Sequence, residues 1–345
     1  MPDPTRTPHK RPGRLTLDQY VDGIRAGDRM ILARAITLME SDLAADNELA
    51  AAVLQAILPL AGNSRRIGIT GVPGAGKSTF IDRLGMHLIH DRGERVAVLT
   101  VDPSSPVTGG SILGDKTRME RLFLEDQAFI RPSAARGHLG GVARRTRETM
   151  LLCEAAGYQD IIVETVGVGQ SETAVRAMTD FFLLLLIPGA GDELQGIKRG
   201  IIEAADGIAV NKADGDNLPK ADRARIEYES ALHLFMTPPD GWKTRVVTCS
   251  ALTGEGIAEI WETILEHRCQ LEASGAFAER RARQALDWMQ ELVMLELHQE
   301  FQSHPAVARR LPELKKAVRE GKLSPLAASR ELLGLFHAGA ITAVI

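Results

Sequence analysis

One stretch of nine residues, 71–79, constrains the fold of this chain more than any other. It reads GVPGAGKST and fills every fixed position of the pattern G-x-x-x-x-G-K-[ST]. A short β-branched run at 66–70 precedes it, and apolar residues at helical spacing follow it from Phe80 onward. Strand, loop and helix in this order are the context of a phosphate-binding loop, or P-loop. That context disfavours the alternative, a glycine-rich turn with an incidental lysine.

The residue types in this loop suit a polyphosphate ligand. Its glycines let the backbone approach the phosphates closely, and the N–H groups that open the following helix attract anions. Lys77 is predicted to reach the β- and γ-phosphates, and the Ser78 hydroxyl to join the shell of a Mg²⁺ ion. The predicted phosphate-binding set is Gly71, Pro73, Gly74, Ala75, Gly76, Lys77, Ser78 and Thr79.

The composition excludes several other classes of protein. The 345 residues are 44% hydrophobic, and the net charge of −4 argues against a nucleic-acid binder that relies on bulk charge. No apolar run reaches the ~20 residues of a membrane span, so neither a membrane nor a nucleic acid is expected as a partner. Three distant cysteines indicate a reducing compartment, and we expect a cytoplasmic, bacterial protein. Residues 1–14 lack the apolar core of a secretory signal, and a disordered tail is favoured there over a very short transit peptide.

Strand-like and helix-like segments alternate through the middle of the chain. Most strand-like runs are continuously apolar, which is typical of strands covered on both faces. The predicted strands are 66–70, 95–101, 128–131, 160–165, 181–187, 207–210 and 245–249. The pattern predicts an α/β fold of the P-loop NTPase type with a mostly parallel, doubly wound sheet. We expect N-terminal helices over 15–62, a P-loop nucleotide domain over 63–270 and a C-terminal helical arm over 271–345.

Acidic residues follow two of the predicted strands, at the edge where parallel sheets bind ligands. Asp102 follows the second strand, and Glu164 closes the fourth, ahead of Gly167. We predict that Asp102 and Glu164 hold Mg²⁺ together with Ser78, and that the Gly167 amide senses the γ-phosphate. Asp115 either assists Asp102 with the metal or the attacking water, or it caps a helix.

Two glycine-rich segments follow other strands. Residues 188–200 combine four glycines with mixed charge, and Lys198 is predicted to change its ion pairs with the nucleotide state. An ordinary strand-to-helix loop is the alternative for this segment. Residues 135–141 carry Arg136 and His138, which either contact phosphate or a partner or stay solvated.

The motif N-K-x-D at residues 211–214 follows another predicted strand. The Asp214 carboxylate can accept both the ring N–H and the exocyclic amine of guanine, a donor pair that adenine lacks, so it selects GTP over ATP. Asn211 is expected to brace neighbouring loops, and the stem of Lys212 to lie along the base. The backbone after the last strand is expected to contact the guanine carbonyl, at Ser250, Ala251 and Leu252.

Helical patterns dominate both ends of the chain. Asp28 and Ser41 are predicted to cap two N-terminal helices, and Ser324 to cap the last helix. An apolar stripe at helical spacing is formed near the C-terminus by Leu286, Met289, Val293, Leu297 and Phe301. Such a stripe is either intrachain core or a dimer interface. Because a complete nucleotide domain leaves little core for it to join, we favour a homodimer.

On these motifs the chain resembles the methylmalonyl-CoA mutase-associated GTPase chaperones of the ArgK/MeaB type. The resemblance runs from about Leu15 to the C-terminus. Its most specific stretches are 68–79, 101–119, 163–172, 188–201 and 211–214. The metal acid of Ras-like GTPases is an aspartate in D-x-x-G, whereas the corresponding residue here is Glu164.

The resemblance implies a slow, Mg²⁺-dependent GTPase, with GTP and GDP as its nucleotides, that binds methylmalonyl-CoA mutase or a related adenosylcobalamin-dependent mutase. Its nucleotide state would control cofactor loading, protect the mutase and release damaged cofactor. Residues 188–198 would relay that state. An adenosyltransferase is a further candidate partner.

Two other functions are compatible with a P-loop. A metallochaperone GTPase would need a cluster of cysteines and histidines, whereas the histidines here are scattered and no Cys-x-x-Cys occurs. A P-loop kinase would need an acceptor pocket and usually lacks N-K-x-D. Both remain alternatives to the mutase chaperone.

Overall fold

The computed structural model describes residues 14–41, 43–101, 119–132, 139–165, 171–189, 199–232 and 241–342. By its internal contacts the chain divides into two compact units, Met1–Ala282 and Arg283–Ile345.

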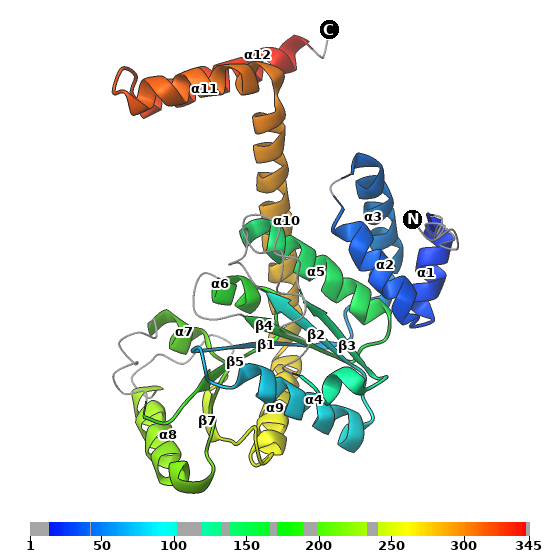
Figure 1. Cartoon of the computed structure of the whole chain (residues 1–345), viewed down its shortest axis with the longest axis vertical. Coiled ribbons are helices and arrows are strands. Elements are labelled where there is room, and N and C mark those ends of the chain that lie inside the picture. Colours follow the sequence, from blue (N-terminus) through cyan, green and yellow to red (C-terminus); the bar gives the residue numbers. More distant parts are fainter. Residues whose placement is uncertain are drawn as a thin grey trace, which may run out of the picture. The chain divides into compact units, whose positions relative to one another are not determined.

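A seven-stranded, entirely parallel sheet forms the centre of the first unit (Figure 1). Its strands are β1 (Arg65–Gly71), β2 (Val96–Val101), β3 (Ala128–Pro132), β4 (Asp160–Thr165), β5 (Phe181–Leu186), β6 (Gly207–Val210) and β7 (Arg245–Thr248). The order in space is β3-β2-β4-β1-β5-β6-β7, so β1 lies in the middle. Every predicted strand is present, and each end lies within one residue of its predicted position.

Strands β2, β3 and β4 send alternate side chains into two hydrophobic cores, one on each face of the sheet. In β2, Val96 and Val98 join one core, whereas Ala97 and Leu99 join the other. All four are buried. This burial on both faces is the reason that the strands are continuously apolar in sequence.

Helices cover both faces of the sheet (Figure 1). Helix α8 (Leu218–Leu232) packs against β6 and β7. One face of the sheet carries α4 (Lys77–Arg92) and α9 (Ile257–Ser274), which contact each other. The other carries α1 (Leu17–Arg25), α2 (Arg29–Met39), α3 (Ala44–Ile57), α5 (Leu139–Ala155) and α6 (Ser171–Arg176). The short helix α7 (Arg199–Ala204) lies between β5 and β6 in the sequence. The predicted α/β, doubly wound architecture is therefore confirmed.

The N-terminal helices show one correct and one wrong capping prediction. Asp28 caps α2, because its side chain accepts hydrogen bonds from the N–H groups of Met30 and Ile31 at 2.8 and 3.1 Å. The prediction for Ser41 is wrong. Helix α3 has Leu43 at its N-cap position without a side-chain bond, and the Ser41 hydroxyl donates to Asp46 instead.

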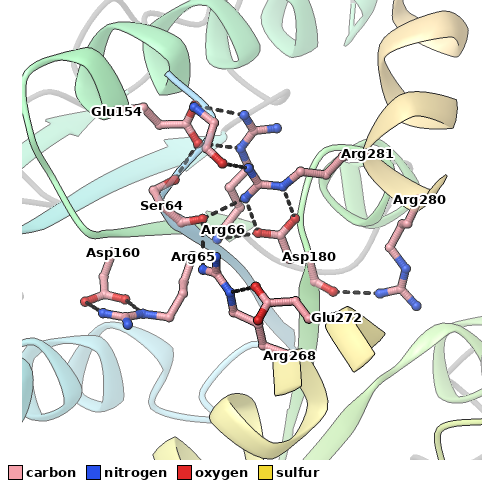
Figure 2. Close-up of polar contacts among 11 residues, drawn as sticks. Ser64, Arg65, Arg66, Glu154, Asp160, Asp180, Arg268, Glu272, Arg280 and Arg281 are labelled. Carbon is pink, nitrogen blue, oxygen red and sulfur yellow. Dashed lines mark hydrogen bonds and ion pairs between the residues drawn. The ribbon is translucent and has the colours of Figure 1, made fainter. Parts of the chain in front are cut away.

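The amino edge of the sheet, where the strands begin, is joined by ion pairs and hydrogen bonds (Figure 2). We call this set the amino-edge network. Its members are Ser64, Arg66, Glu154, Arg176, Asp180, Asp206, Arg280 and Arg281.

Asp180 lies at the centre of this network, directly before β5. Its carboxylate accepts two hydrogen bonds from Arg281, at 2.9 and 2.6 Å, and one from the backbone N–H of Arg66. Arg281 also donates to the Ser64 carbonyl at 2.6 Å. Because Arg281 belongs to the first turns of α10 (Ala276–Ser303), the pair fastens the start of that helix to β1 and β5.

Glu154, at the end of α5, is the second carboxylate of the network. Arg66 donates to both of its oxygens, at 2.8 and 2.9 Å, and the Ser64 hydroxyl donates to one of them. Burial alone would raise the pKa of Glu154, but the hydrogen bonds and charge of Arg66, with help from Ser64 and Arg281, lower it below its ordinary value.

Asp206, directly before β6, is the third carboxylate of the amino-edge network. It accepts from Arg176, the last residue of α6, at 3.0 Å and from the backbone N–H of Phe182 at 2.8 Å. Arg280 lies 3.6 Å from the same carboxylate. The network therefore connects α6, α10 and three strands.

The second unit contains the rest of α10 with α11 (Pro305–Arg319) and α12 (Pro325–Thr342). Val307 and Leu314 of α11 are buried, and the N–H of Ala327 donates to the Ser324 hydroxyl, which confirms the predicted cap. Four members of the predicted stripe on α10 are exposed, since Leu286, Met289, Val293 and Leu297 each show about half of their surface. The fifth, Phe301, is partly buried, and its ring centre lies 5.5 Å from that of Phe336 in α12. Among the described residues, no helix is long and apolar enough to cross a membrane.

Candidate functional site: a nucleotide cradle at the carboxyl edge of the sheet

The P-loop connects the end of β1 to the start of α4. Gly71 ends the strand with φ 154°, and a Cβ there would lie 2.3 Å from the carbonyl oxygen of Leu185. Gly76 has φ 84° and precedes the helix, and a Cβ there would lie 2.8 Å from the amide nitrogen of Asn211. Only glycine fits these two positions, since one is too crowded and the other is both left-handed and crowded.

Lys77 is the first residue of α4, and its ammonium group lies over the loop. Its Nζ donates to the carbonyl oxygens of Gly71 at 2.8 Å and Val72 at 3.3 Å. The N–H groups that open α4 lie at the same place and carry the positive end of the helix dipole. The loop therefore presents a positive charge and backbone donors to an anion.

Two predicted metal ligands meet beside the loop. The Ser78 hydroxyl donates to Oε1 of Glu164 at 3.1 Å, although the two residues lie 86 positions apart in the sequence. Glu164 lies near the end of β4 and is buried. A second bond ties β4 to β1, because the Thr165 hydroxyl donates to that of Thr70 at 2.9 Å. A hydroxyl and a carboxylate oxygen in contact are the hard donors that Mg²⁺ prefers.

Four predicted catalytic residues lie outside the described part of the chain. They are Asp102, Asp115, Gly167 and Lys198.

Asn211 connects the phosphate end of the cradle to the base end. Its side-chain amide donates to the Ala75 carbonyl at 2.7 Å, and its oxygen accepts from the N–H of Ala251 at 2.9 Å. The residue is buried. Each loop thus holds one end of the same planar amide group, so the distance between the loops is fixed.

Asp214 and Ser250 lie together at the end where the sequence predicts the base. The Ser250 hydroxyl donates to Oδ2 of Asp214 at 2.5 Å, which orients the carboxylate. Between Asn211 and Asp214, Lys212 has φ 61°, a left-handed conformation that is uncommon for a residue with a Cβ. The strained backbone turns the chain at the point where Asn211 points to the P-loop and Asp214 to Ser250.

Some contacts at this edge have no signal in the motifs. The thiol of Cys249 lies 3.6 Å from the Asn211 oxygen, and burial raises its pKa to about 12, so it stays protonated. Arg83 of α4 donates to the carbonyl groups of Ala251 and Leu252. These residues lie far apart in sequence, so local patterns could not pair them. Within the described ranges, no group of three or more His, Cys, Asp or Glu side chains could hold a metal ion.

The chain is similar to known GTPases over most of its length. A family model described as methylmalonyl Co-A mutase-associated GTPase MeaB matches residues 32–306. The GTPase ArgK of Escherichia coli is 50% identical over 92% of this chain and 96% of its own length. The mitochondrial methylmalonic aciduria type A homolog of Mus musculus is 46% identical over 93% of this chain and 79% of its own length.

A solved structure is similar as well. A crystal structure described as a LAO/AO transport system kinase aligns with a TM-score of 0.74 and 41% sequence identity. The alignment covers 95% of this chain and 100% of that one.

Proposed function

The chain belongs to the family of methylmalonyl-CoA mutase-associated GTPases of the MeaB type, and we propose that it is a Mg²⁺-dependent switch that acts as a chaperone of a methylmalonyl-CoA mutase. Members of this family are GTP hydrolases that bind guanine nucleotides, and so is this chain. The proposal adds the finer role. The GTP and GDP forms bind the mutase differently, gate the loading of its adenosylcobalamin, and protect or reactivate it.

One observation carries the proposal: Asn211 joins the P-loop and the base-binding loop through the two ends of one amide group. A phosphate cradle and a guanine reader held at a fixed separation fit one nucleotide that spans both. Because the P-loop lies at the end of the central strand β1, the nucleotide would bind close to the ends of its two neighbours, β4 and β5.

The residues divide the work of binding and hydrolysis. Lys77 exchanges the carbonyl groups of Gly71 and Val72 for the β- and γ-phosphates and offsets the charge that develops during phosphoryl transfer. Asp214, held by Ser250, accepts the ring N–H and the amine of guanine. We propose Gly71, Pro73, Gly74, Ala75, Gly76 and Thr79 as further phosphate contacts.

The donor set beside Lys77 fits Mg²⁺. Ser78 and Glu164 already place two hard oxygen atoms in contact, and Asp102 is proposed as a third ligand. A Mg²⁺ ion held by these residues would neutralise part of the charge on the phosphates. Asp115, Gly167 and Lys198 remain proposed contributors to the attacking water, the γ-phosphate contact and the relay of nucleotide state.

We further propose that the exposed stripe on α10 is a homodimer interface. The apolar side chains of Leu286, Met289, Val293 and Leu297 are exposed at successive turns, and such a row is costly to leave in water. An adenosyltransferase is proposed as an additional partner, because cofactor loading requires a source of adenosylcobalamin.

The test is the affinity of the purified protein for methylmalonyl-CoA mutase with GDP and with a non-hydrolysable GTP analogue. We expect the two dissociation constants to differ by about tenfold or more, which is a usual size for coupling between sites. Equal affinities in the two nucleotide states, or no complex in either state, would contradict the chaperone role.

A kinase is the second candidate, since a similar crystal structure carries that description. Incubation with GTP labelled in the γ-phosphate separates the two. Label in free phosphate supports hydrolysis, whereas label on a protein or small molecule supports a kinase.

A further inference from the structure

The loop that is expected to contact the guanine carbonyl is held from outside by Arg83 as well as by Asn211. Its Nε donates to the carbonyl oxygen of Ala251 at 3.4 Å, and Nη2 donates to that of Leu252. The stem of Arg83 lies beside Gly254, where a Cβ would be 3.6 Å from its Cδ atom. Arg83 is 168 residues away in sequence and belongs to α4, the helix that starts at the P-loop.

Bonds within the loop and one bond to Asn211 hold the rest of it. The N–H of Gly254 donates to the Ser250 carbonyl at 2.8 Å, and that of Thr253 to the Ser250 hydroxyl at 3.1 Å. The N–H of Ala251 is taken by Asn211. In the described part of the chain, the N–H of Leu252 has no hydrogen-bond partner, and Leu252 is 71% exposed.

The Ala251 carbonyl and the Leu252 N–H belong to one planar trans peptide, so they point in opposite directions. A donor that fixes the carbonyl therefore also fixes the direction of the N–H. We propose that Arg83 is a positioning residue for guanine recognition. By gripping the Ala251 and Leu252 carbonyls, it aims the Leu252 N–H at the 6-carbonyl oxygen of the base.

This inference rests on the proposed nucleotide site, and it deepens it. Asp214 reads the donor side of guanine, namely the ring N–H and the amine. The Leu252 N–H would read the acceptor beside them. Because α4 carries both Lys77 and Arg83, the same rigid helix positions the phosphate contact and the base contact. The clamp therefore favours a nucleotide with a carbonyl at that ring position.

The experiment compares Arg83→Gln with Arg92→Gln by calorimetric titration with GDP and 6-thio-GDP. Arg92 is a matched control, because it lies on the same helix but pairs with Glu262 of α9 at 3.5 Å. Sulfur is a weak acceptor, so 6-thio-GDP tests the carbonyl contact alone. The turnover of GTP at saturation is measured in parallel.

For Arg83→Gln we expect the dissociation constant for GDP to rise about fivefold, the effect of losing one ordinary hydrogen bond. The dissociation constant for 6-thio-GDP should change little. The ratio of the 6-thio-GDP constant to the GDP constant therefore falls towards one. The kcat for GTP stays within about twofold, because Arg83 lies away from the phosphates. Arg83→Lys, which keeps a positive charge but has a single donor nitrogen, should recover part of the ratio.

A merely structural role gives a different pattern. If Arg83→Gln weakens both nucleotides equally, or weakens neither, the positioning role is wrong. If Arg83→Gln does not fold, the ratio in Arg83→Lys decides, and a ratio equal to that of the unchanged protein overturns the inference. If the unchanged protein binds no GDP at all, the proposed nucleotide site itself fails.

Discussion

The two edges of the sheet are built from the same kinds of residue in opposite ways. At the amino edge, carboxylates and arginines are matched to each other: Asp180 receives two hydrogen bonds from Arg281, and Glu154 receives two from Arg66. At the carboxyl edge, Lys77 is bonded to backbone carbonyls of its own loop. One edge has satisfied its charges internally, whereas the other holds a charge that an anion can take over.

The difference teaches which buried charges serve stability and which serve function. Removing one member of a matched pair leaves the other member buried and uncompensated. Removing a group that contacts exchangeable backbone carbonyls, as Lys77 does, mainly affects the ligand. Mutations at the amino edge should therefore lower stability, whereas mutations at the carboxyl edge should weaken nucleotide binding or hydrolysis.

The largest effect is expected for Lys77→Ala. Loss of the ammonium group should lower GTP hydrolysis on the order of 10³-fold, since the developing charge on the phosphates loses its main protein counter-charge. The midpoint of thermal unfolding should move by only a few degrees, roughly the effect of 1 kcal/mol. Phosphate release and a melting curve measure the two quantities. Hydrolysis at the original rate would mean that the carboxyl edge has been misassigned.

Arg281→Ala should produce the opposite pattern. Asp180 would remain buried without its partner, so the free energy of unfolding should fall by about 3 kcal/mol. Well below the melting temperature, the affinity for GDP should be unchanged. Denaturant unfolding and nucleotide titration test this together. Arg225→Gln is the control, since its i,i+4 pair with Glu229 is partly exposed to solvent and worth about 0.5 kcal/mol or less. A loss of GDP affinity without a loss of stability would show that the amino edge does not serve stability as proposed.

Asp214→Asn should change the choice of base. The amide can no longer accept both guanine donors, so kcat/KM for GTP should fall about 100-fold. Xanthosine triphosphate, which carries a carbonyl in place of the amine, should become the better substrate. Asp216→Asn, two residues away and exposed, should leave the preference as it was. An unchanged base preference in Asp214→Asn would show that another group reads the base.

The smallest effect is a pH dependence at the amino edge. The folded-state pKa of Glu154 is lowered, so its contribution to stability is present above its ordinary value of 4.5 and is lost as the pH falls through the folded-state value. Glu154→Gln should therefore cost about 1–2 kcal/mol at pH 7 and less at pH 4, by urea unfolding at both pH values. A cost that is the same at both pH values would mean that Glu154 is not ionised in the folded protein.

The contrast between the edges also explains what the sequence could predict. The strands were predictable because double burial makes them continuously apolar, and the P-loop because glycine is the only residue that fits positions 71 and 76. The cap at Asp28 was predictable for a similar local reason.

The rest depends on residues that are distant in sequence. The pair of Arg281 and Asp180 spans 101 residues, and the contact of Arg83 with the base loop spans 168. An arginine in an amphipathic helix looks the same whether it is solvated or clamps a remote carbonyl. Ser41 illustrates the local limit, because its hydroxyl bonds the side chain of Asp46 and caps no backbone N–H of the first turn of α3.

The most direct test of the account is a calorimetric titration of the folded protein with GTP and with ATP in the presence of Mg²⁺. A cradle that joins Lys77 to Asp214 through Asn211 should bind one GTP per chain and bind ATP at least about 100-fold more weakly. Folded protein that takes up no GTP, or that binds ATP equally well, would contradict the assignment of the carboxyl edge as a guanine-nucleotide site.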